Sequence, residues 1–235
     1  MPGRDGAFFG RRKGKTLRRA QRYGLDTVLP ALLIDLAGPP PEKLTALFAT
    51  PVDEVRLEIG FGGGEHLLHE AVSYPRTGFI GVEPFENGLA KAVAAIARDG
   101  LRNIRLFNED ALHLLDWLPA GSLSRIDLLY PDPWPKTRHQ KRRFVNGGNL
   151  DRIARCLRPD ATFRFASDVE AYVTWTLREV SRHGGLAWTE THIEACRTAW
   201  PGWPGTRYEA KALAEGRRPA YLTFRKPTLP QDPPR

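Results

Sequence analysis

A carboxylate and a dense group of cations stand together in residues 127–143, DLLYPDPWPKTRHQKRR. Residues 126–130 are mostly apolar and the prolines that follow form a turn signal, so Asp132 is expected at the end of a strand. The polar residues that come next are Lys136, Arg138, His139, Gln140, Lys141, Arg142 and Arg143. Clustered Lys and Arg are typical of nucleic-acid contacts, although a buried turn followed by a solvated charged face fits the same sequence.

The composition also favours a polyanionic partner. The 235 residues include 35 Lys and Arg against 27 Asp and Glu, a formal net charge of +8. Such an excess favours nucleic acid through the summed field of the protein. Cys156 and Cys196 lack the spacing of a zinc site or disulfide framework, and no apolar run could span a membrane or form a signal peptide. We therefore expect reduced thiols, no metal, no membrane association and a cytoplasmic protein.

Strands and helices alternate in the sequence from residue 54 onward. Strands are expected at residues 55–59, 78–82, 104–107, 126–130, 162–166, 186–191 and 221–224. Helices are expected at residues 65–73, 86–98, 150–157 and 170–183. A loop is expected at residues 200–209. The alternation predicts an α/β fold with a parallel sheet and crossover helices.

The chain divides into three parts by composition. Residues 1–50 form a basic N-terminal arm and a lead-in helix, residues 51–226 form the α/β domain, and residues 227–235 form a disordered Pro-rich tail. The arm, residues 1–25, carries many cations and one acid, which fits either a mobile arm on RNA or a solubilising tail.

Polar groups are expected at the ends of the first three strands. Gly60 and Gly62 lie in the turn GFGGG after the first strand, where backbone can approach a ligand closely. Glu83 ends the second strand, where an acid can accept hydrogen bonds from ribose hydroxyls, and Asp110 follows the third. The carboxyl ends of parallel strands meet at one edge of the sheet, so these residues predict a nucleotide-cofactor site.

Dinucleotides and S-adenosylmethionine both suit this pattern, but GFGGG lacks the GxGxxG spacing of dinucleotide sites. S-adenosylmethionine is favoured, with Asp110 placed for the adenine amino group and Glu58 for the methionine amino group. Glu58 could instead be a strand-end acid paired with an Arg. His66 and His69 lack a third metal ligand and are expected on the surface or in packing.

Several segments together resemble the tRNA (guanine-N7-)-methyltransferase family, bacterial single-chain type. They are LEIGFGGGE (57–65), GVEP (81–84), NEDA (108–111), PDPWPKTRHQKRR (131–143), Ser167-Asp168 and TRYE (206–209). The signature PDPWPKxRHxKRR is highly specific, whereas the glycine loop matches many methyltransferases. The resemblance covers residues 54–224 and is poorest over the first fifty residues.

The resemblance implies a Rossmann-like class I methyltransferase, with a mostly parallel seven-stranded sheet, helices on both faces and an antiparallel last strand. It implies methyl transfer from S-adenosylmethionine to N7 of the variable-loop guanine at tRNA position 46. The matching cofactor positions are Glu58, Glu83, Asp110 and Asp132, and Asp132 is also the catalytic position. The matching substrate positions are Lys136, Arg138–Arg143, Asp168, Thr206, Arg207, Tyr208 and Glu209.

The chemistry of guanine agrees with this assignment. The N7 lone pair is free at neutral pH, so no base is needed, and Asp132 is expected to orient the guanine and stabilise the developing positive charge. Trp134 can either stack on a base or pack in the core. Alternatives are methylation of another RNA position or an exocyclic amine, a tRNA-binding module without turnover, and a dehydrogenase. The sequence leaves the oligomeric state open.

Overall fold

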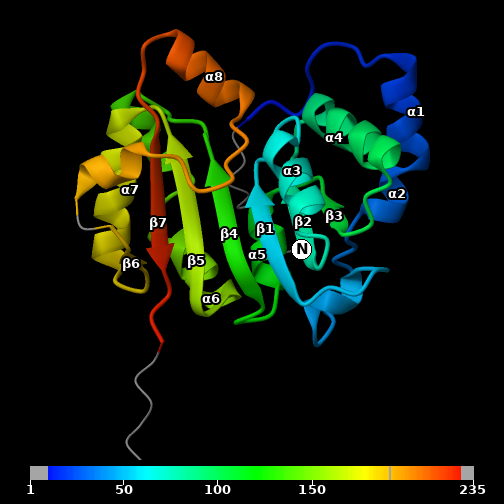
Figure 1. The fold of residues 1–235 in the computed structure, drawn as a ribbon, viewed down its shortest axis with the longest axis horizontal. Helices are drawn as coiled ribbons and strands as arrows, with labels where there is room; N and C mark the ends of the chain where they lie inside the picture. Colours follow the sequence, from blue (N-terminus) through cyan, green and yellow to red (C-terminus); the bar gives the residue numbers. More distant parts are fainter. Residues whose placement is uncertain (1–9, 191, 229–235) are drawn as a thin grey trace, which may run out of the picture.

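A seven-stranded sheet forms the centre of the computed structural model, which describes residues 10–190 and 192–228. The strands are β1 (Glu54–Ile59), β2 (Thr77–Val82), β3 (Ile104–Phe107), β4 (Leu123–Leu129), β5 (Leu157–Ser167), β6 (Ala187–Trp188) and β7 (Ala220–Arg225). Their order is β3-β2-β1-β4-β5-β7-β6 (Figure 1). The first five strands in this order are parallel, and β7 is antiparallel to β5 and β6. This topology confirms the predicted class I methyltransferase fold and its antiparallel last strand.

Helices cover both faces of this sheet (Figure 1). They are α1 (Arg19–Thr27), α2 (Leu29–Leu32), α3 (Glu65–Ser73), α4 (Glu86–Asp99), α5 (Ala111–Trp117), α6 (Gly147–Cys156), α7 (Glu170–His183) and α8 (Arg207–Ala214). Short 3-10 helices are η1 (Leu44–Leu47), η2 (Thr137–Arg142) and η3 (Ile193–Arg197). In the described part of the chain, no helix combines the length and the apolar character that crossing a membrane requires.

The central strands are buried because apolar side chains pack on both of their faces. All six residues of β2 are buried. On one face, Phe79 and Ile104 pack with Leu67 of α3 and Val93 of α4. On the other face a larger cluster joins the sheet to α5, α6 and α7. Burial on both faces explains why β2 is an apolar run without a polar alternation.

Two helices of the α/β domain, α5 and α8, were absent from the sequence prediction. Helix α5 begins at Asp110, whose side chain accepts a hydrogen bond from the backbone N–H of Leu112 at 3.0 Å. Helix α8 begins inside the segment predicted as a loop, where Thr206 and Glu209 form a capping box. Conversely, the strand predicted at 186–191 includes only Ala187–Trp188 among its described residues, and residue 191 lies outside them. The capping signal T-x-x-E was present in the sequence and identifies the start of α8.

Part of the N-terminal arm, whose sequence fits either a mobile arm on RNA or a solubilising tail, is held against the α/β domain by hydrogen bonds. The N–H of Glu86 donates to the carbonyl of Arg12 at 2.9 Å, and the Asn87 side chain bonds the backbone of both Gly14 and Lys15. Helix α1 then packs against α4. Residues 1–9, and residues 229–235 of the tail predicted at 227–235, lie outside the described residues.

A chain of buried ion pairs crosses the sheet from β1 to β5. Asp127 of β4 accepts hydrogen bonds from Arg125 at 2.8 Å and from Arg164 at 2.6 Å. Arg125 also pairs with Glu70 of α3. Burial alone would raise the pKa of Asp127, but Arg125 and Arg164 outweigh it and hold this pKa far below the usual range. The ionised carboxylate is therefore the form that stabilises the fold.

We predict that Asp127→Ala lowers the free energy of unfolding by about 3 kcal/mol at pH 7, because it leaves buried guanidinium groups uncompensated. The depressed pKa gives a sign for the pH dependence: the stabilisation is present above the unfolded-state pKa near 4 and is lost as pH falls. Urea unfolding between pH 7 and pH 3 measures both effects. Asp53→Ala breaks the exposed pair with Arg76 and serves as a control that should change little. An equally small effect of Asp127→Ala would contradict the role of the buried pairs.

Candidate active site

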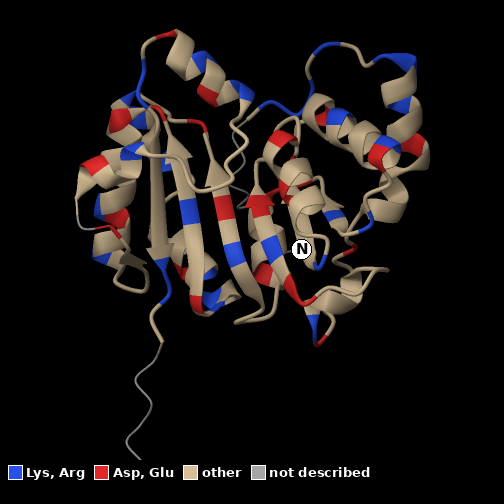
Figure 2. Ribbon diagram, viewed as in Figure 1, with Lys and Arg blue, Asp and Glu red and all other residues tan. Residues whose placement is uncertain are grey.

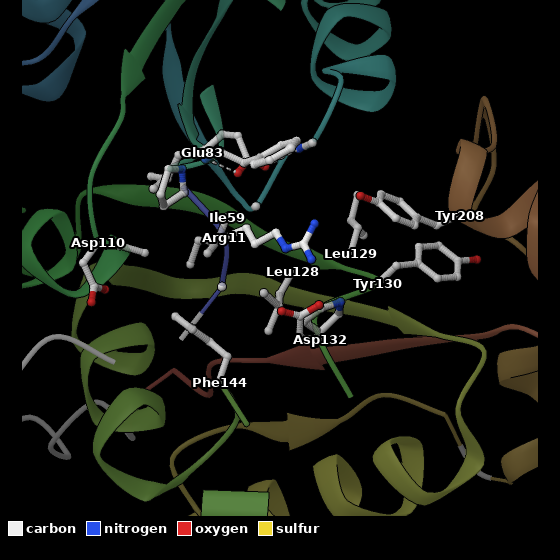
Figure 3. A pocket seen from close by; sticks show the side chains of 18 of the residues that line it. Arg11, Ile59, Glu83, Asp110, Leu128, Leu129, Tyr130, Asp132, Phe144 and Tyr208 are labelled. Atoms are coloured by element: carbon white, nitrogen blue, oxygen red, sulfur yellow. Dashed lines mark hydrogen bonds between the residues drawn. The ribbon is translucent and has the colours of Figure 1, made fainter. Parts of the chain in front are cut away.

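The carboxyl ends of the parallel strands border a cavity of about 450 Å³ (Figure 3). Five of the six residues predicted to bind the cofactor line it, and they follow four different strands: Gly60, Gly62, Glu83, Asp110 and Asp132. These residues are far apart in the sequence, but the fold brings them together because parallel strands end at the same edge of the sheet. A cavity of this size suits a nucleoside that bears an amino acid.

Glu83 is held in place by backbone groups from two loops. Its two carboxylate oxygens accept hydrogen bonds from the N–H of Gly62 at 2.7 Å and of Phe85 at 2.8 Å. Burial raises the pKa of Glu83, and these two hydrogen bonds offset part of the rise. Gly88 of α4 lies against the Gly62 carbonyl, where a Cβ would collide. The glycine loop is thus fixed from both sides, and the remaining lone pairs of Glu83 can accept from ribose hydroxyls.

Asp110 and Tyr208 lie on opposite sides of the cavity, which is therefore elongated (Figure 3). The Asp110 side chain caps α5 through the Leu112 N–H and is buried. A fixed carboxylate at this position can accept hydrogen bonds from the amino group of adenine. With Glu83 between the two ends, the acids suit the successive parts of S-adenosylmethionine.

Glu58, the sixth predicted cofactor residue, is not among the residues that line the cavity. Its carboxylate is buried and pairs with His66 Nδ1 at 2.7 Å. Successive strand residues face opposite sides, so Ile59 reaches the cavity while Glu58 faces α3. The alternative prediction of a paired strand-end acid is therefore closer to the structure, with His66 in place of an Arg.

The two histidines have different surroundings. Burial lowers the pKa of His66, but Glu58 opposes this effect and the net shift is upward. His69 is exposed and its Nε2 lies 3.1 Å from the Gly202 carbonyl. Within residues 10–190 and 192–228, no cluster of three or more His, Cys, Asp or Glu side chains could hold a metal ion.

Asp132 lies in a strained turn at the end of β4. Tyr130 and Trp134, on either side of it, have φ angles of 50° and 41°, which residues other than glycine rarely adopt. Such conformations cost on the order of 1 kcal/mol or more and require support from the surrounding structure. The Asp132 side chain opens into the cavity, where partial loss of hydration raises its pKa. The turn thus holds one carboxylate at the cavity wall.

Trp134 lines the same cavity and lies outside the hydrophobic core clusters of the described residues. The Arg142 guanidinium lies 5.0 Å from the centre of its ring, and His139 makes an edge contact at 5.9 Å. Of the two interpretations of Trp134, packing in the core is wrong. Stacking on a base stays a prediction.

The basic segment after the turn divides into two groups. Lys136, Arg138 and Lys141 are exposed, and Arg142 lines the cavity. Arg143, predicted to contact RNA, is buried with 2% exposure, and its Nε donates to the Pro133 carbonyl at 2.9 Å. Its guanidinium also packs on two aromatic rings of α7. Arg143 therefore supports the Asp132 turn from a buried position, unlike the exposed cations next to it.

The predicted substrate residues at the start of α8 also divide. Arg207 and Tyr208 line the cavity beside Gly62. Glu209 is buried, and its carboxylate accepts hydrogen bonds from Tyr221, from Trp203 Nε1 at 2.6 Å and from the Thr206 N–H at 3.2 Å. Thr206 and Glu209 therefore hold the start of α8 in place, and Arg207 and Tyr208 form part of the cavity wall.

Asp168 ends β5, one strand away from Asp132 in the sheet. It accepts a hydrogen bond from Arg217 Nε at 2.5 Å and does not line the cavity. Cavity residues that the sequence interpretation missed include Arg11, Tyr130, Phe85 and Phe144. A non-glycine residue in a left-handed turn, such as Tyr130, has no local sequence signal, and Arg11 was hidden among many cations of the arm.

The chain is similar to known methyltransferases along most of its length. A family model described as "Putative methyltransferase" matches residues 53–221. The tRNA (guanine-N(7)-)-methyltransferase of Rhizobium johnstonii is 59% identical over 220 residues, which cover 94% of this chain and 94% of the relative. The proteins of the same name from Azorhizobium caulinodans and Brucella melitensis are 60% and 58% identical over 219 residues, 93% of this chain and 94% of each relative.

Solved structures share the fold at low sequence identity. The [4+2]-cyclase SpnF has a TM-score of 0.53 at 18% identity, covering 89% of this chain and 97% of that chain. An antibiotic-related methyltransferase has a TM-score of 0.51 at 20% identity, covering 75% of this chain and 89% of that chain. These two likenesses show the fold alone. The family match and the identities near 60% carry the assignment: the chain belongs to the tRNA (guanine-N(7)-)-methyltransferase family.

Proposed function

We propose that the protein transfers the methyl group of S-adenosylmethionine to N7 of the variable-loop guanine, position 46, in tRNA. The observation that carries the proposal is that Asp132, within the PDPWPKxRHxKRR signature, opens into the same cavity as Glu83 and Asp110. The cofactor-type acids and the residue proposed for catalysis thus share one site. The relatives named for this reaction support the choice of tRNA and of N7.

The residues of the chain act mainly by positioning. Bound S-adenosylmethionine supplies the methyl group as a positively charged sulfonium. Glu83 accepts from the ribose hydroxyls and Asp110 from the adenine amino group, which orients the nucleoside along the cavity. Asp132 faces the cavity from the opposite wall, where it accepts hydrogen bonds from guanine and stabilises the positive charge that methylation creates.

No general base is needed because N7 carries a free lone pair and no proton. Orientation can supply several kcal/mol of the rate enhancement, up to roughly 7 to 11 kcal/mol in ideal cases. Trp134 and Tyr208 offer aromatic faces at the cavity wall against which the guanine base can stack.

The exposed cations provide a surface for tRNA phosphates. Lys and Arg lie along the N-terminal segment and on α8, on either side of the strand ends (Figure 2). Lys136, Arg138 and Lys141 add cations next to the Asp132 turn. Such contacts make binding strongly salt-dependent. The buried free thiols of Cys156 and Cys196 support a cytoplasmic location, where thiols stay reduced.

The direct test is to incubate the pure protein with unmodified tRNA and S-adenosylmethionine and then to treat the RNA with borohydride and aniline. We expect one chain break, in the variable loop, because this treatment cleaves at N7-methylguanosine. A tRNA with another base at position 46 serves as the control and should remain intact. Methyl incorporation without a break would place the methyl group on another atom, and no incorporation would reject the enzyme assignment in favour of a binding module.

Asp132→Asn should lower the single-turnover rate by about two orders of magnitude with tRNA and cofactor saturating, because the amide cannot balance the charge on the methylated base. The raised pKa of Asp132 predicts that the wild-type rate falls on acidification at a higher pH than a freely solvated aspartate would give. Glu109→Gln, an exposed acid near the end of β3, is the matched control. A near-normal rate for Asp132→Asn would show that Asp132 has no such role.

Lys141→Ala should weaken binding of all tRNAs alike, because one phosphate contact is lost. The slope of the logarithm of the binding constant against the logarithm of the salt concentration should become shallower by up to about one unit. Filter binding between 50 and 200 mM salt measures the slope. Lys43→Ala removes an exposed charge at the amino ends of the strands and should leave it unchanged. Equal slopes for wild type and Lys141→Ala would mean that this face does not bind phosphate.

A further inference from the structure

The N-terminal segment, residues 10–15, lies across the start of α4 next to the ribose-binding acid. The Glu86 N–H donates to the Arg12 carbonyl, and Asn87 bonds Gly14 and Lys15 at 2.8 and 2.6 Å. Arg22 of α1 pairs with Glu86 at 2.8 Å. These contacts place the segment at the cavity, and Gly10 and Arg11 form part of the cavity wall.

The Arg11 side chain extends into the cavity, with Glu83 on one side and Asp132 on the other (Figure 3). It runs away from Asp110 and toward the side where Tyr208 lies. Two other guanidinium groups line the cavity, but Arg142 lies on Trp134 and Arg207 donates to the Tyr208 hydroxyl at 3.0 Å. Among the described residues, Arg11 has no recorded side-chain hydrogen bond or ion pair.

The cavity acids determine which part of the cofactor needs this cation. With adenine at Asp110 and ribose at Glu83, the amino-acid end must lie farther from Asp110, on the side that Arg11 approaches. That end carries a carboxylate, which the cavity acids Glu83 and Asp132 would repel. A guanidinium can bind a carboxylate through two parallel hydrogen bonds and offset this repulsion.

We propose that Arg11 binds the carboxylate of the methionyl group of the cofactor, so that the N-terminal segment completes the cofactor site. The inference rests on the proposed function only through the identity of the cofactor. It gives one cation of the arm a role in cofactor binding, in addition to the two interpretations, an RNA-binding arm or a solubilising tail, that the composition of the arm allowed.

The test compares two ligands that differ only in the carboxylate: S-adenosylhomocysteine and its decarboxylated analogue, S-adenosyl-3-thiopropylamine. Calorimetric titration of the full chain without tRNA gives both affinities. Arg11→Ala should weaken S-adenosylhomocysteine about tenfold, a modest factor because Arg11 remains in contact with solvent, and should change the analogue less than about twofold. Arg11→Lys should recover part of the loss.

Lys13→Ala is the matched control, because it removes the same charge from the same segment at a residue that does not line the cavity. It should leave both affinities unchanged. Equal losses for both ligands, tighter binding of both, or an unchanged affinity for S-adenosylhomocysteine would each overturn the proposal for Arg11. If the wild-type chain bound neither ligand, the cofactor assignment itself would fail, which is a different result from loss of discrimination between them.

Discussion

The carboxylate of Glu83 ties together the two loops on which the site depends. It accepts from the glycine loop after β1 through Gly62 and from the start of α4 through Phe85. Both donors are backbone amides, so their positions follow directly from the path of the chain. Because the carboxylate is buried, these hydrogen bonds also offset part of the cost of keeping it charged. The same group that shapes the loops is thus presented to the ligand in a fixed orientation.

The opposite wall of the cavity is built in another way. Asp132 lies between two residues in left-handed conformations, and the buried Arg143 supports the turn. The guanidinium of Arg143 bonds the Pro133 carbonyl and packs on aromatic rings of α7. A signature that reads as a continuous basic run therefore contains two kinds of cation: exposed ones suited to phosphates, and a buried one that holds the Asp132 turn in place.

Segments near both ends of the sequence complete a site whose central sheet also occurs in other proteins. The likeness to the [4+2]-cyclase SpnF and to an antibiotic-related methyltransferase shows that this fold also occurs in proteins of low sequence identity. In this chain, segments outside the sheet also line the cavity: the segment before α1 supplies Arg11, and α8 supplies Arg207 and Tyr208. Glu209 fixes the start of α8 through Trp203 and Tyr221.

The sequence alone determined the alternation of strands and helices and the strand ends that carry Glu83, Asp110 and Asp132. These features are local, since hydrophobic periodicity and turn residues are set within a few positions. Tertiary structure decided which way side chains point. Glu58 faces His66 and not the cavity, Arg143 is buried among residues of α7, and Arg11 reaches a site that lies far along the chain. Each outcome depends on partners distant in sequence, because the pairing and burial of a charged side chain are fixed only when the elements pack together.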